Sequence, residues 1–203
     1  MGNKYYAVNI RDFLDENSEV FIGENALQDI LSEFSCRPNL DVEYFLLHNA
    51  IEFTKKSQSV TYLVFNKENG NIVGYYTLAI KPITILSERL SNNAKKKLER
   101  VSVLDEASQS YTVSAYLIAQ LGKNYALENE LQIPGRELLA YAYEQIKAGK
   151  HSFGGVIAFL ECEDKSILLD FYQKNGHNLF NKRETKAKSE YEPHFLHQLM
   201  KFV

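Results

Sequence analysis

The sequence is poor in the residues and patterns that identify many protein classes. It has two cysteines, Cys36 and Cys162, four prolines and no tryptophan among its 203 residues. Two cysteines exclude a disulfide framework, and we expect reduced thiols and a cytoplasmic protein because the N-terminus shows no export signal. No apolar run approaches the roughly 18 residues of a membrane-spanning helix, which predicts that the chain has no membrane partner.

Motifs of several large enzyme classes are also missing. The sequence has no G-x-x-x-x-G-K-[ST] phosphate loop, no G-x-G-x-x-G dinucleotide fingerprint and no G-x-S-x-G nucleophile elbow. Its five histidines form no zinc-binding spacing, so we predict no metal site. The net charge of −3 argues against a protein that coats nucleic acid, but it leaves room for a local basic patch.

The composition that remains is that of a folded domain, with 45% hydrophobic and 24% charged residues. Hydrophobic periodicity predicts helices over 26–34, 42–53, 87–100, 136–148 and 165–175. Alternating or continuous apolar runs predict strands over 60–65, 72–80, 113–121, 155–162 and 195–203. This order predicts an α/β or α+β fold in which a mixed sheet is covered by helices.

Local signals predict where some of these elements end. Pro82 is expected to end the strand over 72–80 or to mark an edge, and Gly149 to stop the helix over 136–148. Asn25 is expected to cap the first helix. Residues 182–188 are read as a basic loop.

The stretch from Tyr111 to Gly176 is the most informative part of the chain. An apolar strand ends in Gly122-Lys123-Asn124, and Pro134-Gly135-Arg136 then opens an amphipathic helix. A Pro-Gly pair before a helix is in itself only a turn and a helix start. Together with the preceding strand and glycine turn, however, it indicates an anion site, because free N–H groups and the helix dipole both favour negative charge there.

Residues 60–203 resemble the general N-acetyltransferase (GNAT) superfamily. The similar pieces are the hairpin with Val73-Gly74-Tyr75-Tyr76-Thr77-Leu78, the strand Tyr116–Leu121 with its glycine turn, the helix start Gly135-Arg-Glu-Leu-Leu139, and Leu169-Asp-Phe-Tyr172-Gln-Lys-Asn-Gly176. Within the superfamily, the hairpin, Phe34-Ser-Cys36 and Phe195-Leu-His-Gln-Leu-Met200 resemble the acetyltransferase toxins of toxin–antitoxin pairs. The match covers about two thirds of the chain, in the order that the family has.

The resemblance implies one GNAT-like domain over residues 1–203 with a central, mostly antiparallel mixed sheet. Residues 1–59 would supply a strand and two helices on the acceptor side, and residues 60–203 the core. The implied activity is direct transfer of an acetyl group from acetyl-CoA, the cosubstrate, to a primary amine. The implied cofactor-binding residues are Leu121, Gly122, Lys123, Ile133, Pro134, Gly135 and Arg136.

The loop departs from the family pattern Arg/Gln-x-x-Gly-x-Gly/Ala. If Gly135 is the last glycine, Glu130 and Ile133 replace the first Arg/Gln and the first Gly. If Gly135 is the first glycine, Gln132 fits and Glu137 replaces the last small residue. The alignment of Leu138-Leu139 favours the first register, and both remain open.

The resemblance implies that Tyr172 is the catalytic acid, since it stands where the family holds its tyrosine. A thiolate leaving group has a pKa near ~8.5, and a phenol with a pKa near ~10 can protonate it. Without the resemblance, a helical tyrosine is more often packed in the core. Glu161 and Glu163 are the candidates for the general base, with solvated carboxylates at a strand end as the alternative.

The acceptor and the partners stay open in the sequence. Aminoacyl-tRNA, the acceptor of the toxins, and a small-molecule amine are both compatible with it, as is a silent CoA-binding or assembly module. A homodimer and an antitoxin are the implied protein partners. The cations that would form a tRNA-binding rim, instead of solvated faces, are Lys95, Lys96, Lys97, Arg100, Lys182, Arg183, Lys186 and Lys188.

Overall fold

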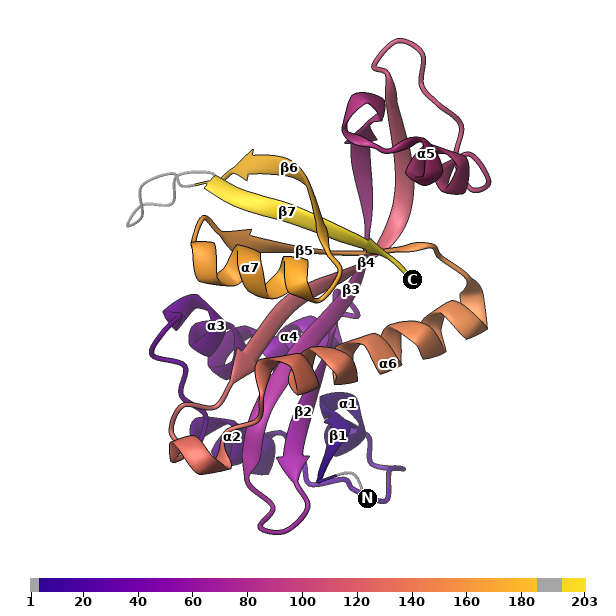
Figure 1. The fold of residues 1–203 in the computed structure, drawn as a ribbon. Coiled ribbons are helices and arrows are strands. Elements are labelled where there is room, and N and C mark those ends of the chain that lie inside the picture. Colours follow the sequence, from indigo (N-terminus) through magenta and orange to yellow (C-terminus); the bar gives the residue numbers. More distant parts are fainter. Residues whose placement is uncertain (1–3, 186–194) are drawn as a thin grey trace. The chain divides into compact units, whose positions relative to one another are not determined.

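The computed structural model describes residues 4–185 and 195–203, which form two compact units. The first unit comprises Met1–Ala79 and Ile118–Gln145, and the second comprises Ile80–Leu117 and Ile146–Val203. Two strands and one helix pass from one unit into the other (Figure 1). The organisation as a single domain stays a prediction.

The first unit is built on a strongly apolar antiparallel sheet. Strand β1 (Tyr5–Asn9) pairs with β2 (Val60–Asn66), and β2 pairs with β3 (Ile72–Leu86). Successive side chains of a strand point to opposite faces, so the Tyr75 ring lies on one face and the Tyr76 ring on the other. The antiparallel pairing of β2 with β3 forms the predicted hairpin, and Gly70 in its turn has a left-handed conformation.

Helices from the N-terminal segment cover one face of this sheet. They are α1 (Ile10–Leu14), α2 (Glu24–Ser32), α3 (Leu40–Tyr44) and α4 (Ala50–Lys55), with a π-helical turn over Phe45–Asn49. Their apolar residues join those of the sheet in one buried cluster that includes Leu27, Leu31, Leu46, Leu63 and Tyr75. The predicted cap at Asn25 is wrong, because α2 begins at Glu24 after Gly23.

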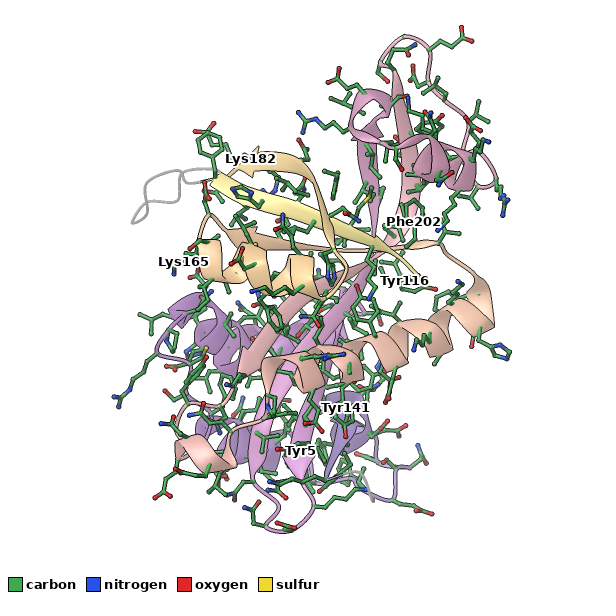
Figure 2. All side chains as sticks on the ribbon, in the orientation of Figure 1. Tyr5, Tyr116, Tyr141, Lys165, Lys182 and Phe202 are labelled. Atoms are coloured by element: carbon green, nitrogen blue, oxygen red, sulfur yellow. The ribbon has the colours of Figure 1, made fainter. Side chains whose placement is uncertain are left out.

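Strand β4 (Ser110–Lys123) leads through a short 3₁₀ turn (Asn129–Leu131) to α6 (Gly135–Phe153). In the first unit, α6 is tied to β1 because the Tyr141 hydroxyl donates a hydrogen bond to the Tyr5 carbonyl at 2.8 Å (Figure 2). The predicted stop at Gly149 is wrong. A Cβ there would lie 3.1 Å from the Phe153 ring and 3.3 Å from the Tyr116 ring, so this glycine serves packing within the helix. The chain turns instead at Gly154 and Gly155, both with positive φ.

The second unit holds the rest of β3 and β4 and a three-stranded antiparallel group. Strand β7 (Phe195–Phe202) lies between β5 (Ile157–Glu163) and β6 (Asn178–Glu184), and α7 (Ser166–Lys174) lies alongside them (Figure 1). Between β3 and β4 the chain forms a 3₁₀ turn (Ser87–Arg89) and α5 (Asn92–Leu98). Buried residues of both parts, among them Ile83, Val113, Phe159 and Phe180, form one apolar cluster.

Two boundaries in this unit differ from the prediction. Strand β3 continues through Pro82 to Leu86, where Thr84 shares a hydrogen bond with Thr112 of β4. The expected loop over 182–188 begins inside β6, because residues up to Glu184 pair with β7. Lys186 and Lys188 lie outside the described residues.

The hydrogen-bonded strand order is β1-β2-β3-β4-β5-β7-β6 in a seven-stranded sheet. With helices placed between the strands along the chain, this confirms the predicted α/β class. Within residues 4–185 and 195–203, no helix is long and apolar enough to cross a bilayer.

Candidate functional site

The end of β4 carries three of the predicted cofactor residues, Leu121, Gly122 and Lys123, in the first unit. Gly122 is buried, and a Cβ there would lie 2.6 Å from Val42 Cγ1 and 2.8 Å from Tyr75 Cε1. The Tyr75 hydroxyl donates to the Val42 carbonyl at 2.6 Å. Gly122 is thus explained by the close approach of α3 to the sheet, a packing constraint that holds this strand end in place.

The next residue, Asn124, fixes the chain as it leaves β4. Its buried side chain accepts hydrogen bonds from the amides of Ser35 and Ala126 and donates to the carbonyls of Glu33 and Ile72. Because all these bonds are satisfied in the interior, the loop starts from a rigid point. This role of Asn124 was not predicted from the sequence, although an asparagine after a Gly-Lys turn is a recognisable signal for it.

The other four predicted cofactor residues, Ile133 to Arg136, lie at the start of α6. Ile133 is fully buried, and the Pro134 carbonyl accepts from the amides of Glu137 and Leu138. The amides of Gly135 and Arg136 therefore precede the first intrahelical bond and have no carbonyl partner within the helix. Arg136 is exposed.

The chemistry of this helix start suits a phosphorylated ligand such as acetyl-CoA. Two amides without an intrahelical partner, the positive end of a 19-residue helix and the Arg136 guanidinium all favour an anion. Glu137 in the same first turn opposes it with its own negative charge. Lys123, 5.3 Å above the Tyr125 ring, adds a cation at the end of β4.

Tyr172 lies in the second unit on α7, close to the end of that helix. Its side chain is 9% exposed and packs edge-on against Phe171 at 5.0 Å between ring centroids. Burial, with a smaller contribution from the charge of a nearby Cys162 thiolate, raises the pKa of Tyr172 above its usual value of 10.0. The phenol therefore keeps its proton throughout the neutral range.

His177 supports Tyr172 from the turn that follows α7. The His177 amide donates to the Tyr172 carbonyl at 3.1 Å, and His177 Nδ1 lies 3.0 Å from the same oxygen. A carbonyl only accepts, so Nδ1 carries the proton. Burial is the main cause that lowers the pKa of His177 to about 4. His177 was not predicted as a site residue, and its place directly after Gly176 is the one sequence signal for it.

Glu161, the candidate base, is held by two neighbours in the second unit. Arg183 makes a two-pronged ion pair with its carboxylate, with Nε 2.9 Å from Oε1, and Gln198 Nε2 donates to Oε1 at 2.7 Å. Burial acts to raise the pKa of Glu161, but the hydrogen bonds from Arg183 and Gln198 and the charge of Arg183 outweigh it, so this pKa is lowered. No sequence signal predicted these partners, since they come from the pairing of β5, β7 and β6.

Glu163, the other candidate base, forms an ion pair with Lys165, and Lys182 Nζ lies 3.8 Å from Asp164 Oδ2. The end of β5 is thus surrounded by paired charges. The Glu163 carboxylate is engaged by a cation, as the Glu161 carboxylate is, so the contacts do not favour Glu163 over Glu161.

Tyr172 and Glu161 lie on opposite faces of β5. Cys162, whose charge acts on Tyr172, and Glu161 are adjacent in the strand and so point to opposite sides. In the first unit, the structure groups the candidate cofactor residues at the end of β4 and the start of α6. In the second unit, it groups Tyr172 and Glu161 around β5. The roles of all nine residues stay predictions.

Only the fold of this protein can be compared with known proteins, because sequence comparison gives no match. No protein-family model matches the chain, and no curated protein matches it in sequence. The described residues contain no group of histidine, cysteine, aspartate and glutamate side chains placed to hold a metal ion.

Solved structures of the toxin AtaT and of KacT share the fold. AtaT complexed with acetyl-methionyl-tRNAfMet matches with a TM-score of 0.61 and 15% identity over 94% of this chain and 93% of AtaT. A tyrosine-to-phenylalanine mutant of KacT matches with a TM-score of 0.62 and 13% identity over 96% of this chain and 95% of KacT. A tyrosine-to-phenylalanine mutant of AtaT, bound to the C-terminus of the antitoxin AtaR and acetyl-CoA, matches with a TM-score of 0.59 and 14% identity, covering 98% and 94% of the two chains. The predicted likeness to the acetyltransferase toxins is confirmed at the level of the fold.

Proposed function

We propose that this protein is an N-acetyltransferase that moves an acetyl group from acetyl-CoA directly to a primary amine. The observation that carries the proposal is Tyr172, a buried phenol that keeps its proton, on the helix after β5 in this fold. The match to AtaT bound to acetyl-CoA supports the choice of acyl donor.

The residues that would hold acetyl-CoA are those of the first unit. The pyrophosphate would bind at Ile133 to Arg136, and the pantetheine would pair with the backbone around Leu121, Gly122 and Lys123. When bound, acetyl-CoA supplies an acetyl group activated as a thioester. A backbone amide near Leu121 would polarise the carbonyl of that group.

Tyr172 would donate its Oη proton to the leaving sulfur. Its raised pKa ensures that the proton is present, and it also makes the phenol a weaker acid than free tyrosine. We therefore expect the proton to move together with the departure of the thiolate, whose pKa is near ~8.5, and to be replaced from solvent.

Because Glu161 lies on the face of β5 opposite Tyr172, the proton of the attacking amine would pass to solvent and not to this carboxylate. The lowered pKa of Glu161 keeps it ionised at neutral pH and also makes it a weak base. The amine needs little help to lose its proton, because an α-amino group has a pKa of about 8 and roughly a tenth of it is neutral at pH 7.

For the acceptor we favour aminoacyl-tRNA over a small amine, because AtaT is known in complex with acetyl-methionyl-tRNAfMet. The cations on α5 that would contact phosphates are Lys95 and Lys96. Lys97 already lies 4.8 Å from the Phe202 ring, and Arg183 is paired with Glu161, so the remaining cations would carry this role.

We propose further that an antitoxin binds this protein, as AtaR binds AtaT. A homodimer is a separate proposal, which light scattering on the purified protein would test. A silent CoA-binding module is the alternative from another class, and release of CoA with any amine would argue against it.

Titration calorimetry with acetyl-CoA tests the proposal at the binding step. We expect binding to the wild type and much weaker binding to Gly135→Glu, which would place a carboxylate at the helix start. The matched control is Ala140→Glu, which adds the same charge at an exposed position of the same helix, more than one turn away from its start. No binding to the wild type, or equal binding to Gly135→Glu, would contradict the proposal.

A further inference from the structure

Three consecutive apolar side chains are exposed in the loop between α1 and α2. Val20, Phe21 and Ile22 are 45%, 43% and 37% exposed. Single apolar residues are common on protein surfaces, but a run of three is unusual unless it serves a contact. The loop therefore presents a candidate interaction surface in the first unit.

Backbone hydrogen bonds hold this loop in one conformation. The amides of Ile22 and Gly23 both donate to the Phe13 carbonyl, at 3.1 Å and 3.0 Å. The Phe21 amide donates to the Ser18 carbonyl at 3.1 Å. A partner that covers the three apolar side chains would thus meet a surface that is already ordered, which lowers the entropy cost of association.

The surroundings of this loop are acidic. Residues 12–36 carry seven carboxylates and no lysine, arginine or histidine. Glu24 is paired with Lys55, whereas Glu16 and Glu19, within the loop, are exposed and have no ion-pair partner in the part of the chain that the structure describes. Nucleic acid and anionic lipid would be repelled here, so the charge favours a cationic protein surface as the partner.

The second unit exposes a surface of the opposite sign. Residues 89–104, which contain α5, carry five lysines and arginines and one carboxylate. After this helix, Val101 and Val103 are 52% and 88% exposed, and the neighbouring Arg100 is exposed too. Apolar side chains and positive charge therefore lie together at this point of the chain.

Buried contacts hold this basic segment in place. Leu98 is fully buried, and its carbonyl accepts hydrogen bonds from the amides of Val101 and Ser102 at 2.9 Å and 2.8 Å. The Ser102 hydroxyl donates to the Thr112 carbonyl on β4 at 3.0 Å. The chain thus carries two ordered surfaces with exposed apolar side chains, one acidic and one basic.

We propose that these two surfaces bind each other between two copies of this chain. The loop over 20–22 of one copy would cover Val101 and Val103 of another, with its carboxylates facing the cations. Two acidic loops or two basic segments would repel each other, so the contact joins unlike surfaces. Lys95 and Lys96, assigned above to tRNA phosphates, lie on the helix that leads into the basic surface, so bound tRNA would compete with the second copy.

Light scattering and sedimentation velocity on the purified protein test the contact. We expect the wild type to self-associate as its concentration rises over roughly 1–100 µM, the range of a small interface. Raising the salt from about 0.05 M to about 0.5 M should weaken the association several-fold, because exposed charges are screened. A wild type that stays monomeric at every concentration would overturn the proposal.

Two substitutions tie the association to these surfaces. Phe21→Ser and Val103→Ser each remove apolar area from one surface, and we expect each to weaken self-association by about 10-fold or more. The matched control is Leu40→Ser, because Leu40 is 65% exposed on α3, outside both surfaces, and its loss should leave the association unchanged. Circular dichroism melting checks that all three variants are folded. Equal weakening by all three, or by neither of the first two, would overturn the proposal.

A mixture of the two weakened variants tests whether unlike surfaces meet. Phe21→Ser keeps its basic surface and Val103→Ser keeps its acidic loop, so the mixture can form a contact that neither variant forms alone. We expect the mixture to self-associate more strongly than either variant at the same total concentration. A mixture as weak as its components would overturn the pairing of the acidic loop with the basic segment.

These outcomes do not depend on acetyl transfer. The inference names the surfaces of the self-association proposed above, and association through other surfaces would overturn it while the proposed homodimer stands. Binding of acetyl-CoA, measured separately by calorimetry, decides the proposed activity whichever way the association experiments fall.

Discussion

Protonation of His177 should destabilise the protein between pH 6.5 and pH 4. The side chain is 2% exposed, and its pKa falls from the ordinary 6.5 to about 4 in the folded state. In this window the unfolded chain binds a proton that the folded protein does not bind. Stability from the neutral imidazole is therefore complete above pH 6.5 and is lost as the pH falls towards 4.

The size of the effect follows from the two pKa values. The difference between 6.5 and about 4 corresponds to about 3 kcal/mol in full, at about 1.4 kcal/mol per tenfold change in proton affinity. At pH 5 the unfolded state is almost fully protonated and the folded state largely neutral, so about 2 kcal/mol of this should already be lost.

Urea unfolding at pH 7.5 and pH 5 measures the loss, with His177→Asn as the matched variant. The asparagine amide has a donor near the place of Nδ1 and does not titrate. Carboxylates contribute equally to both proteins, so the wild type should lose about 2 kcal/mol more than the variant between the two pH values. Equal losses would refute the reasoning and show that His177 titrates normally.

Four other substitutions test contacts elsewhere in the two units. Tyr172→Phe should lower kcat by about 100-fold with an unchanged Kd for acetyl-CoA, measured by CoA release and calorimetry; an unchanged kcat would remove the role as acid. Gly122→Ala should cost about 2 kcal/mol in urea unfolding, because the new methyl group overlaps Val42 and Tyr75. Asn124→Ala should cost about 3 kcal/mol, since it leaves buried backbone groups without partners, and a loss below ~1 kcal/mol would contradict that. Glu161→Gln should flatten the decline of stability below about pH 4.5, because the wild-type carboxylate has a lowered pKa and stabilises the fold only while ionised.

Periodicity in the sequence was enough to predict most elements of the fold. Helix α7 and strands β2 and β5 agree with their predicted ranges to within two residues, since each has a clear apolar pattern and a turn signal at its end. Errors arose where tertiary contacts override local signals. Gly149 stays inside α6 because Phe153 and Tyr116 pack against it, and β3 passes Pro82 because β4 extends beside it.

The sequence indicated some residues of the candidate site but not the partners that hold them. The start of α6 was indicated by its turn and helix start as well as by the family resemblance, whereas Tyr172 was indicated as catalytic by the resemblance. The partners of Glu161 could not be predicted, because Arg183 and Gln198 meet it only through the register of β5, β7 and β6. A slip of one residue in that register would turn these side chains to the other face.

Acetyl transfer itself tests the central claim most directly. Purified protein is incubated with acetyl-CoA and methionyl-tRNA, and the amino acid released from the tRNA by alkali is analysed by mass spectrometry. We predict acetylmethionine with the wild type and about 100-fold less per unit time with Tyr172→Phe. Absence of acetylated product with the wild type, for methionyl-tRNA and for every other charged tRNA and small amine tried, would contradict the account.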